Sequence, residues 1–208
     1  MTPLVLALLS MAAPAGDAAS IIESLGAAGR ALKTMKAAFL ETKVVEVLDE
    51  KQETRGSVLL EIPGRLRWNY TSPQESALLI KDGRFARYFP KSKQVFRGPA
   101  KGEADLLVGF GPGAADLGRK YEVTLIGEEA VGAVASWVLD LKPRAPEQGL
   151  FVGIRLWVDK GRSIPVQTRL TEPTGDHTTI RFENVVVNGP LPRDSFDLVL
   201  PKDVVEVK

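Results

Sequence analysis

Hydrophobic and polar residues alternate most regularly in the stretch Gly56–Tyr70, which is interrupted by Pro63-Gly64. Such an alternation with one apolar face is typical of a half-exposed antiparallel strand. Proline fixes φ at the first central position of a turn and glycine tolerates positive φ at the second, so a type II turn is predicted over Ile62–Arg65. The stretch is therefore predicted to be a hairpin. Its apolar face consists of Val58, Leu60, Ile62, Leu66, Trp68 and Tyr70.

Alternation elsewhere predicts a long series of further strands. Two of them pair across Asp82-Gly83, a two-residue hairpin signal, and the first ends at a charged tip, Asp49–Glu53. The predicted strands are Ala37–Leu48, Glu75–Lys81, Phe85–Phe89, Gln94–Arg97, Tyr121–Glu128, Ala133–Leu141, Leu150–Asp159, Val166–Thr171 and His177–Val187. Pro192–Phe196 is predicted to form a final helical turn before an extended tail.

Each of these strands has one apolar face. Trp137, Leu139 and Leu141 share a face, and Leu150, Val152, Ile154, Leu156 and Val158 share another, opposite Arg155, Trp157 and Asp159. Antiparallel strands of this kind must curl or pack against a second layer. Because one helix and a short segment cannot cover so long a sheet, we expect an incompletely filled apolar concavity, the kind of site that binds apolar ligands. A simple packed sandwich fits the pattern equally well.

The only long helical pattern covers Ser20–Lys36. Asp17 or Ser20 can cap it. Its apolar stripe consists of Ile21, Leu25, Ala28, Leu32 and Met35. Gly26 and Gly29 weaken it by about 1 kcal/mol each relative to alanine. The helix is expected either to pack on the sheet or to cover the mouth of a concave sheet.

The segment Gly98–Gly118 contains six glycines and two prolines. Short helical turns are its expected form, and long glycine-interrupted loops in compact domains are commonly functional, for example as lids. A surface loop that tucks Leu107 and Phe110 into the core is the alternative. A phosphate loop is disfavoured because Gly109–Gly113 lacks the Gly-Lys-Ser/Thr ending.

Met1–Ala15 has the features of a cleaved export signal. An apolar run, Leu4–Leu9, precedes the A-x-A-like triplet Ala13-Pro14-Ala15, although no lysine or arginine comes before the run. The run is shorter than the roughly 20 residues needed to span a bilayer. A frayed N-terminus on a cytosolic protein is the alternative. The expected mature product is a single periplasmic domain from Gly16 to Lys208.

Composition narrows the possible functions. The chain has 208 residues, 44% hydrophobic and 25% charged, with a formal net charge of +1 and no cysteine. This balance gives no electrostatic case for nucleic-acid binding, which depends on clustered cations. The lack of cysteine excludes disulfides, thiolate catalysis and cysteine-ligated metals.

Groups suited to catalysis are sparse. The single histidine, His177, follows a turn and is expected to be solvated. Glu128-Glu129 and Asp49-Glu50 are expected to be solvated turns rather than acid/base pairs, and no G-x-S-x-G elbow is present. Core packing is expected for two of the three tryptophans, with Trp157 the exception on the arginine side of its strand. We therefore expect no enzyme activity, no metal and no cofactor.

Several motifs occur in an order that resembles the periplasmic outer-membrane lipoprotein carrier (LolA-like) family. The motif G-x₆-P-G-x-(apolar)-x-W-x-Y is followed by Pro73, Lys81-Asp82-Gly83 and Tyr88-Phe89-Pro90. Met35–Glu41 resembles the family's first strand, and Phe196–Val207 resembles its closing segment. Two positions depart from the family pattern: Ile62 stands where arginine usually precedes the turn proline, and Leu66 replaces an aromatic residue.

The resemblance implies an incomplete, half-open antiparallel β-barrel covered by an N-terminal helix and a short helical lid. It implies a carrier that takes acylated lipoproteins from an inner-membrane ABC transporter to an outer-membrane acceptor or the outer membrane itself, with a monomer expected. In the family, the arginine at the position of Ile62 is implicated in holding the lid closed. A lipoprotein-binding sensor of similar fold and a carrier of another lipid are the alternatives.

Strand parity combined with this resemblance gives a candidate cavity and lid. A one-residue error in the register of a strand would move its predicted inward-facing side chains to the outer face of the sheet. The predicted cavity wall consists of Val58, Leu60, Ile62, Leu66, Trp68, Leu78, Ile80, Trp137, Leu139, Ile154 and Leu156. The predicted lid consists of Leu25 and Leu32 from the helix with Leu106, Leu107 and Phe110.

Overall fold

The computed structural model describes residues 17–100, 107–145, 147 and 149–207. The predicted signal Met1–Ala15 lies outside these residues, as does Leu106 of the predicted lid. The described residues form one twelve-stranded sheet in the order β12-β6-β5-β4-β3-β2-β1-β11-β10-β9-β8-β7. The strands are β1 (Thr34–Val45), β2 (Glu50–Glu61), β3 (Arg65–Ser72), β4 (Ser76–Lys81), β5 (Arg84–Phe89), β6 (Gln94–Pro99), β7 (Tyr121–Val131), β8 (Val134–Pro143), β9 (Gly153–Asp159), β10 (Pro165–Thr171), β11 (His177–Val187) and β12 (Val205–Val207).

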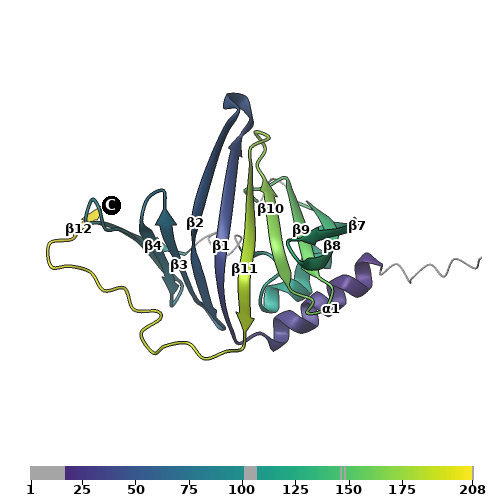
Figure 1. The fold of residues 1–208 in the computed structure, drawn as a ribbon, viewed down its shortest axis with the longest axis horizontal. Helices are drawn as coiled ribbons and strands as arrows, with labels where there is room; N and C mark the ends of the chain where they lie inside the picture. Colours follow the sequence, from purple (N-terminus) through teal and green to yellow (C-terminus); the bar gives the residue numbers. More distant parts are fainter. Residues whose placement is uncertain (1–16, 101–106, 146, 148, 208) are drawn as a thin grey trace, which may run out of the picture.

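The sheet curves but does not close, because β12 and β7 at its two ends are not neighbours (Figure 1). Only the pairing of β12 with β6 is parallel among the described pairs. This is the half-open, largely antiparallel sheet that the sequence predicted. Helix α1 (Ala18–Ala31) and three short helices, η1 (Glu46–Leu48), η3 (Pro112–Asp116) and α2 (Leu117–Lys120), complete the described part of the fold.

The hairpin of β2 and β3 has the predicted parity. Val58 lies opposite Trp68 and Leu60 opposite Leu66, and all four side chains are buried. Gly64 has the positive φ expected of it, 76°, while the peptide bond between Ile62 and Pro63 is cis, which the predicted type II turn did not include. The neighbouring hairpin of β4 and β5 turns at Asp82-Gly83 as predicted, with positive φ at both residues.

Helix α1 is shorter than the Ser20–Lys36 predicted from its stripe. The side chain of Asp17 caps it by accepting a hydrogen bond from the Ser20 N–H at 2.6 Å. It ends at Ala31 because Asn188 accepts from the Lys33 N–H at 2.7 Å and donates to the Ala31 carbonyl at 3.2 Å, which directs the chain into β1. Leu32 and Met35 lie beyond the end of the helix but are also buried. Their apolar side chains therefore matched the helical stripe although they are not helical.

The first hairpin tip was also placed wrongly. Glu46–Leu48 forms a 3-10 helix, and Asp49 adopts a left-handed conformation. The chain therefore reverses over Glu46–Asp49, which overlaps the predicted tip Asp49–Glu53 only at Asp49. Glu50–Glu53 belongs to β2 and pairs with Thr42–Val45. These charged residues are exposed, because this part of β2 extends beyond the core.

A later boundary differs as well. Strand β9 begins at Gly153 rather than Leu150, and Leu150 and Val152 are exposed instead of sharing the buried face. Pro192–Phe196 forms a single turn, as predicted, closed by a hydrogen bond from the Ser195 N–H to the Pro192 carbonyl. The tail beyond it adds β12, which the sequence did not predict, at the edge of the sheet.

Candidate functional site

The apolar interior lies between the inner face of the sheet, α1 and the segment Leu107–Asp116. It contains two buried clusters, and the predicted wall is divided between them. The first cluster contains six of the predicted wall residues: Val58, Leu60, Leu66, Trp68, Leu78 and Ile80. Ile62 packs against this cluster and is half-buried. Leu139, Ile154 and Leu156 belong to the second, and Trp137 packs against it half-buried.

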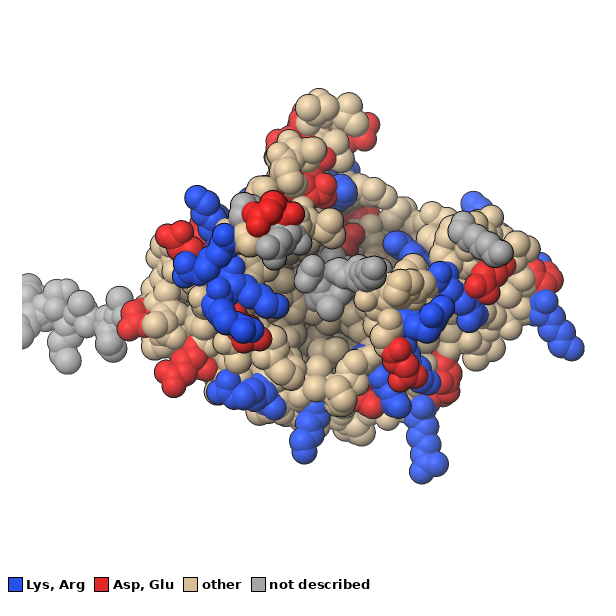
Figure 2. All heavy atoms as spheres, turned by 180° about the vertical axis from the view of Figure 1, so that it is seen from behind, with Lys and Arg blue, Asp and Glu red and all other residues tan. Residues whose placement is uncertain are grey.

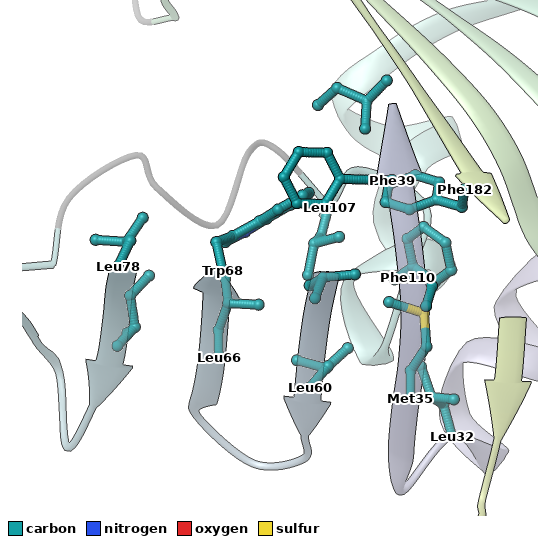
Figure 3. Close-up of a cluster of buried hydrophobic side chains, with 14 of the residues drawn as sticks. Leu32, Met35, Phe39, Leu60, Leu66, Trp68, Leu78, Leu107, Phe110 and Phe182 are labelled. Atoms are coloured by element: carbon teal, nitrogen blue, oxygen red, sulfur yellow. The ribbon is translucent and has the colours of Figure 1, made fainter. Parts of the chain in front are cut away.

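The predicted lid residues also divide. Leu32, Leu107 and Phe110 are buried in the first cluster, whereas Leu25 is buried in the second. Figure 3 shows Leu107 and Phe110 next to the side chains that project from the strands of the first cluster. The wall of this cluster is therefore covered by the glycine-rich segment itself.

Aromatic rings form the centre of the first cluster. Trp68 packs edge-on against Phe39, with ring centroids 4.6 Å apart, and Phe110 packs edge-on against Phe182 at 5.2 Å (Figure 3). Phe39 and Phe182 lie opposite each other on β1 and β11. Neither was included in the predicted wall, although the alternation of Met35, Ala37 and Phe39 carried the same signal as the chosen strands.

Glycines allow the segment Leu107–Asp116 to approach its neighbours closely. A Cβ on Gly29 of α1 would lie 2.2 Å from the carbonyl oxygen of Gly111, and a Cβ on Gly109 would lie 2.8 Å from Pro165. Gly109 and Gly111 also have positive φ, 87° and 68°. The two helix glycines that seemed only to weaken α1 thus face this segment, since a Cβ on Gly26 would lie 3.1 Å from Ala115.

Ile62 makes an apolar contact with the same segment. Its Cδ1 atom is 3.1 Å from where a Cβ of Gly111 would be. The side chain ahead of the turn proline therefore lies beside the segment that covers the wall, and it carries no hydrogen-bonding groups.

A polar margin, formed by Glu41, Tyr70 and Arg87, borders the aromatic centre. The Arg87 guanidinium lies 5.3 Å from the centroid of the Tyr70 ring. Burial raises the pKa of Glu41 above its ordinary value, partly offset by the charges of Arg87 and Lys43. Burial, together with the Glu41 charge, raises the pKa of Tyr70 to about 12. Sequence analysis missed this margin, because its residues are scattered over three strands.

The outer face of β7–β10 is chemically different. A cavity of about 640 Å³ there is lined by charged groups such as Asp140, Arg155 and Arg169. Asp140 and Arg155 form a two-pronged ion pair at 2.6 and 3.0 Å. This open cavity, with charged and apolar lining residues, does not coincide with the predicted apolar wall, of which only Ile154 borders it.

The residues considered for catalysis occupy structural positions. His177 is not solvated as predicted: its side chain is 12% exposed, with Nδ1 3.2 Å from Glu46 and Nε2 in contact with Arg169. Glu129 accepts a hydrogen bond from Trp157 Nε1 at 2.7 Å, while Glu128 pairs with Lys160. Trp157 is itself a core residue, packed with Val138 and Val166 in a third small cluster.

Within the described ranges, no group of three or more histidine, aspartate or glutamate side chains is arranged to hold a metal ion. No helix in the part of the chain that the structure describes is long and apolar enough to cross a membrane.

Comparison of the fold with solved structures gives two informative likenesses. An uncharacterised conserved protein from Thermus thermophilus superposes with a TM-score of 0.61 at 14% identity, covering 91% of this chain and 98% of that one. MucB superposes with a TM-score of 0.58 at 18% identity, covering 89% of this chain and 64% of MucB. At these identities the likeness concerns the fold alone.

Comparison of sequences identifies the family. The chain is 28% identical to the outer-membrane lipoprotein carrier protein of Chromobacterium violaceum over 93% of this chain and 89% of that protein. It is 29% identical to the protein of the same name from Azotobacter vinelandii over 84% of this chain and 82% of that protein. The family described as outer membrane lipoprotein carrier protein LolA matches residues 30–199. The chain therefore belongs to the LolA family.

Proposed function

We propose that this protein is a periplasmic carrier that shields the acyl chains of lipoproteins in its apolar interior. It takes them from an inner-membrane ABC transporter and delivers them to an outer-membrane acceptor or to the outer membrane itself. Membership of the LolA family and the names of the curated relatives support this proposal. The protein acts as a monomeric carrier and not as an enzyme.

The covering of the apolar wall by Leu107 and Phe110 is the observation that carries the proposal. These side chains occupy the position on Trp68 and its neighbours that an acyl chain needs. Each buried methylene of an acyl chain gains about 0.8 kcal/mol. A chain of ordinary length can therefore displace two apolar side chains and still be bound favourably. The predicted wall residues of both clusters and the predicted lid, Leu106 included, form the proposed binding site.

Binding and release require the segment Leu107–Asp116 to move. Figure 2 shows a hollow in one face of the molecule, with charged residues around its rim. Movement of the segment away from α1 would enlarge the apolar surface available to a ligand, and its return would help to expel the ligand. A lid that moves in this way is a common means of controlling access to a site.

Trp68→Glu tests the position of the acyl site. Trp68 is fully buried on the wall, and a carboxylate in its place lacks a partner in apolar surroundings. We expect loss of binding to a fluorescent fatty-acyl probe, with the fold retained by circular dichroism. Thr71→Glu is the matched control, because Thr71 is exposed on the outer face of the same strand. Unchanged probe affinity in Trp68→Glu would contradict the assigned site.

Crosslinking tests the direction of transport. Crosslinked partners recovered from cells should include both an inner-membrane transporter and outer-membrane lipoproteins. Recovery of one regulatory membrane protein, without any lipoprotein passing to an acceptor membrane, would instead identify a sensor.

A further inference from the structure

Trp68 carries a polar atom that the apolar interior does not satisfy. Its side chain is completely buried, and Nε1 has no hydrogen-bond partner among the described residues. Its aromatic neighbours are Phe39, Tyr70 and Phe182. Buried donors in folded proteins are nearly always paired, and one that is left unpaired is costly. A hydrogen-bond acceptor brought into the apolar interior by a ligand would relieve this cost.

Charged groups lie on the same face of the sheet as this donor. Arg87 is opposite Leu78, which in turn is opposite Trp68, so all three side chains share the inner face. Glu41 is two residues beyond Phe39 on β1 and shares that face too. The polar margin of Glu41, Tyr70 and Arg87 thus continues directly from the aromatic centre, through the Tyr70 ring that stacks on Trp68 at 6.4 Å.

We propose that Trp68 Nε1 and the polar margin bind the uncharged ester or amide linkages of acyl chains, and that Glu41 disfavours ligands with a free anionic group. This inference rests on the proposed carrier function and specifies its substrate class. A linkage carbonyl accepts the hydrogen bond from Trp68 while its hydrocarbon chain lies on the apolar wall. Arg87 alone would attract a carboxylate or phosphate, but the carboxylate of Glu41 on the same face interacts electrostatically with Arg87 and opposes a second negative charge there.

Ligands matched in chain length separate the contributions of carbonyl, charge and hydrocarbon. The probes are an uncharged S-dipalmitoylglyceryl-cysteine peptide, its dihexadecyl ether analogue without the ester carbonyls, dipalmitoylglycerol, and palmitate. Affinities are measured by competition with a fluorescent acyl probe on the full mature chain. We expect the wild-type protein to prefer the ester peptide to its ether analogue by about tenfold, the size of one hydrogen bond to a buried donor.

Two variants assign the effects to residues. Trp68→Phe removes the donor but keeps an aromatic ring, so it should abolish the preference for ester over ether while still binding the ether analogue. Glu41→Gln removes the negative charge but keeps the shape, so it should increase palmitate affinity several-fold and leave the ether analogue unaffected. Because the second variant tests the charge separately, the proposal can be judged even if Trp68→Phe folds poorly.

The possible results distinguish the proposal from the function on which it rests. Equal binding of ester and ether ligands by the wild-type protein, or an ester preference that persists in Trp68→Phe, overturns the role of Trp68. Unchanged palmitate affinity in Glu41→Gln overturns the role of Glu41. Failure of the wild-type protein to bind any acyl ligand, the ether analogue included, overturns the carrier function and this inference with it. Comparison of the affinities for the peptide and for dipalmitoylglycerol identifies whether the protein binds the ester linkage in lipoproteins specifically or in glycerolipids generally.

Discussion

Some residues at the margin of the apolar interior are well placed to bind a ligand but lower the stability of the folded protein. Glu41 is the clearest case, because burial raises the pKa of its carboxyl group. At a pH well below its ordinary pKa of 4.5, the carboxyl group is neutral in both the folded and the unfolded states. At a pH above the raised pKa of the folded state, the group is ionised in both states, and burial of its charge lowers the stability of the folded protein. Glu41 therefore lowers stability at neutral pH and not in acid.

Glu41→Gln should accordingly raise the melting temperature at about pH 7, and the gain should disappear as the pH falls below the ordinary carboxyl pKa. Thermal unfolding followed by circular dichroism at about pH 7 and about pH 3.5 measures this. Glu53→Gln is the control, since Glu53 forms only exposed ion pairs on the neighbouring strand, and such pairs contribute little. A gain of equal size at both pH values would show that ionisation of Glu41 is not its cause.

Ile62 is the residue at which this chain departs most informatively from its family pattern. Its contact with Gly111 is apolar and can be exchanged for contact with an acyl chain. An arginine there could hydrogen-bond the backbone of the covering segment through its planar fork and compete with the ligand. Ile62→Arg should therefore weaken binding of an acyl probe by about 1–3 kcal/mol and speed its release.

Probe affinity and dissociation rate, measured at one salt concentration, test this prediction. Ile62→Met serves as a control because it is also long but remains apolar, and it should leave both quantities nearly unchanged. Equal or tighter binding by the arginine variant would mean that Ile62 does not control release.

At the scale of elements, alternation predicted the hairpins well because each strand packs one face against the interior. It failed where the buried face continues through a change of structure: Leu32 and Met35 extend the stripe of α1 although the helix ends at Ala31. The tip at Glu46–Asp49 was missed because the charged strand beyond it has no buried face. The role of Gly29 depends on a contact 82 positions along the chain, with Gly111, for which local sequence gives no signal.

Gly29→Ala tests whether α1 and the covering segment form a tight closed state. The added methyl group would overlap the Gly111 carbonyl, so the segment must shift away from α1. Overpacking of this kind costs about 1–3 kcal/mol, against about 1 kcal/mol gained in helix propensity. We expect lower stability with tighter binding of an acyl probe, because the segment competes less well for the wall.

The control for this variant is Gly113→Ala, which adds a methyl group to the same segment where no atom lies within 4 Å. It should bind the probe as the wild-type protein does. Weaker probe binding by Gly29→Ala would show that the close contact at Gly29 favours the ligand-binding state rather than the closed one.

At the scale of the whole molecule, the strand pattern left a curved sheet and a packed sandwich equally possible, and only the family resemblance predicted the open, curved sheet that the structure has. The pattern could not predict the path of the C-terminal tail, which crosses the outer face. There Arg67 donates to the carbonyls of Ser195 and Asp197, both at 3.1 Å. Nor could it show that the wall divides into two clusters, since parity gives the face of a residue but not its neighbours across the sheet.

The central claim is that the apolar interior, now covered by Leu107 and Phe110, is the place where lipoprotein acyl chains are held. Native mass spectrometry of the mature protein, purified without detergent and mixed with a lipoprotein in acylated and deacylated forms, tests it most directly. The account predicts a one-to-one complex with the acylated form alone, weakened by Trp68→Glu. A complex that forms equally with the deacylated lipoprotein, or no complex with either, would contradict it.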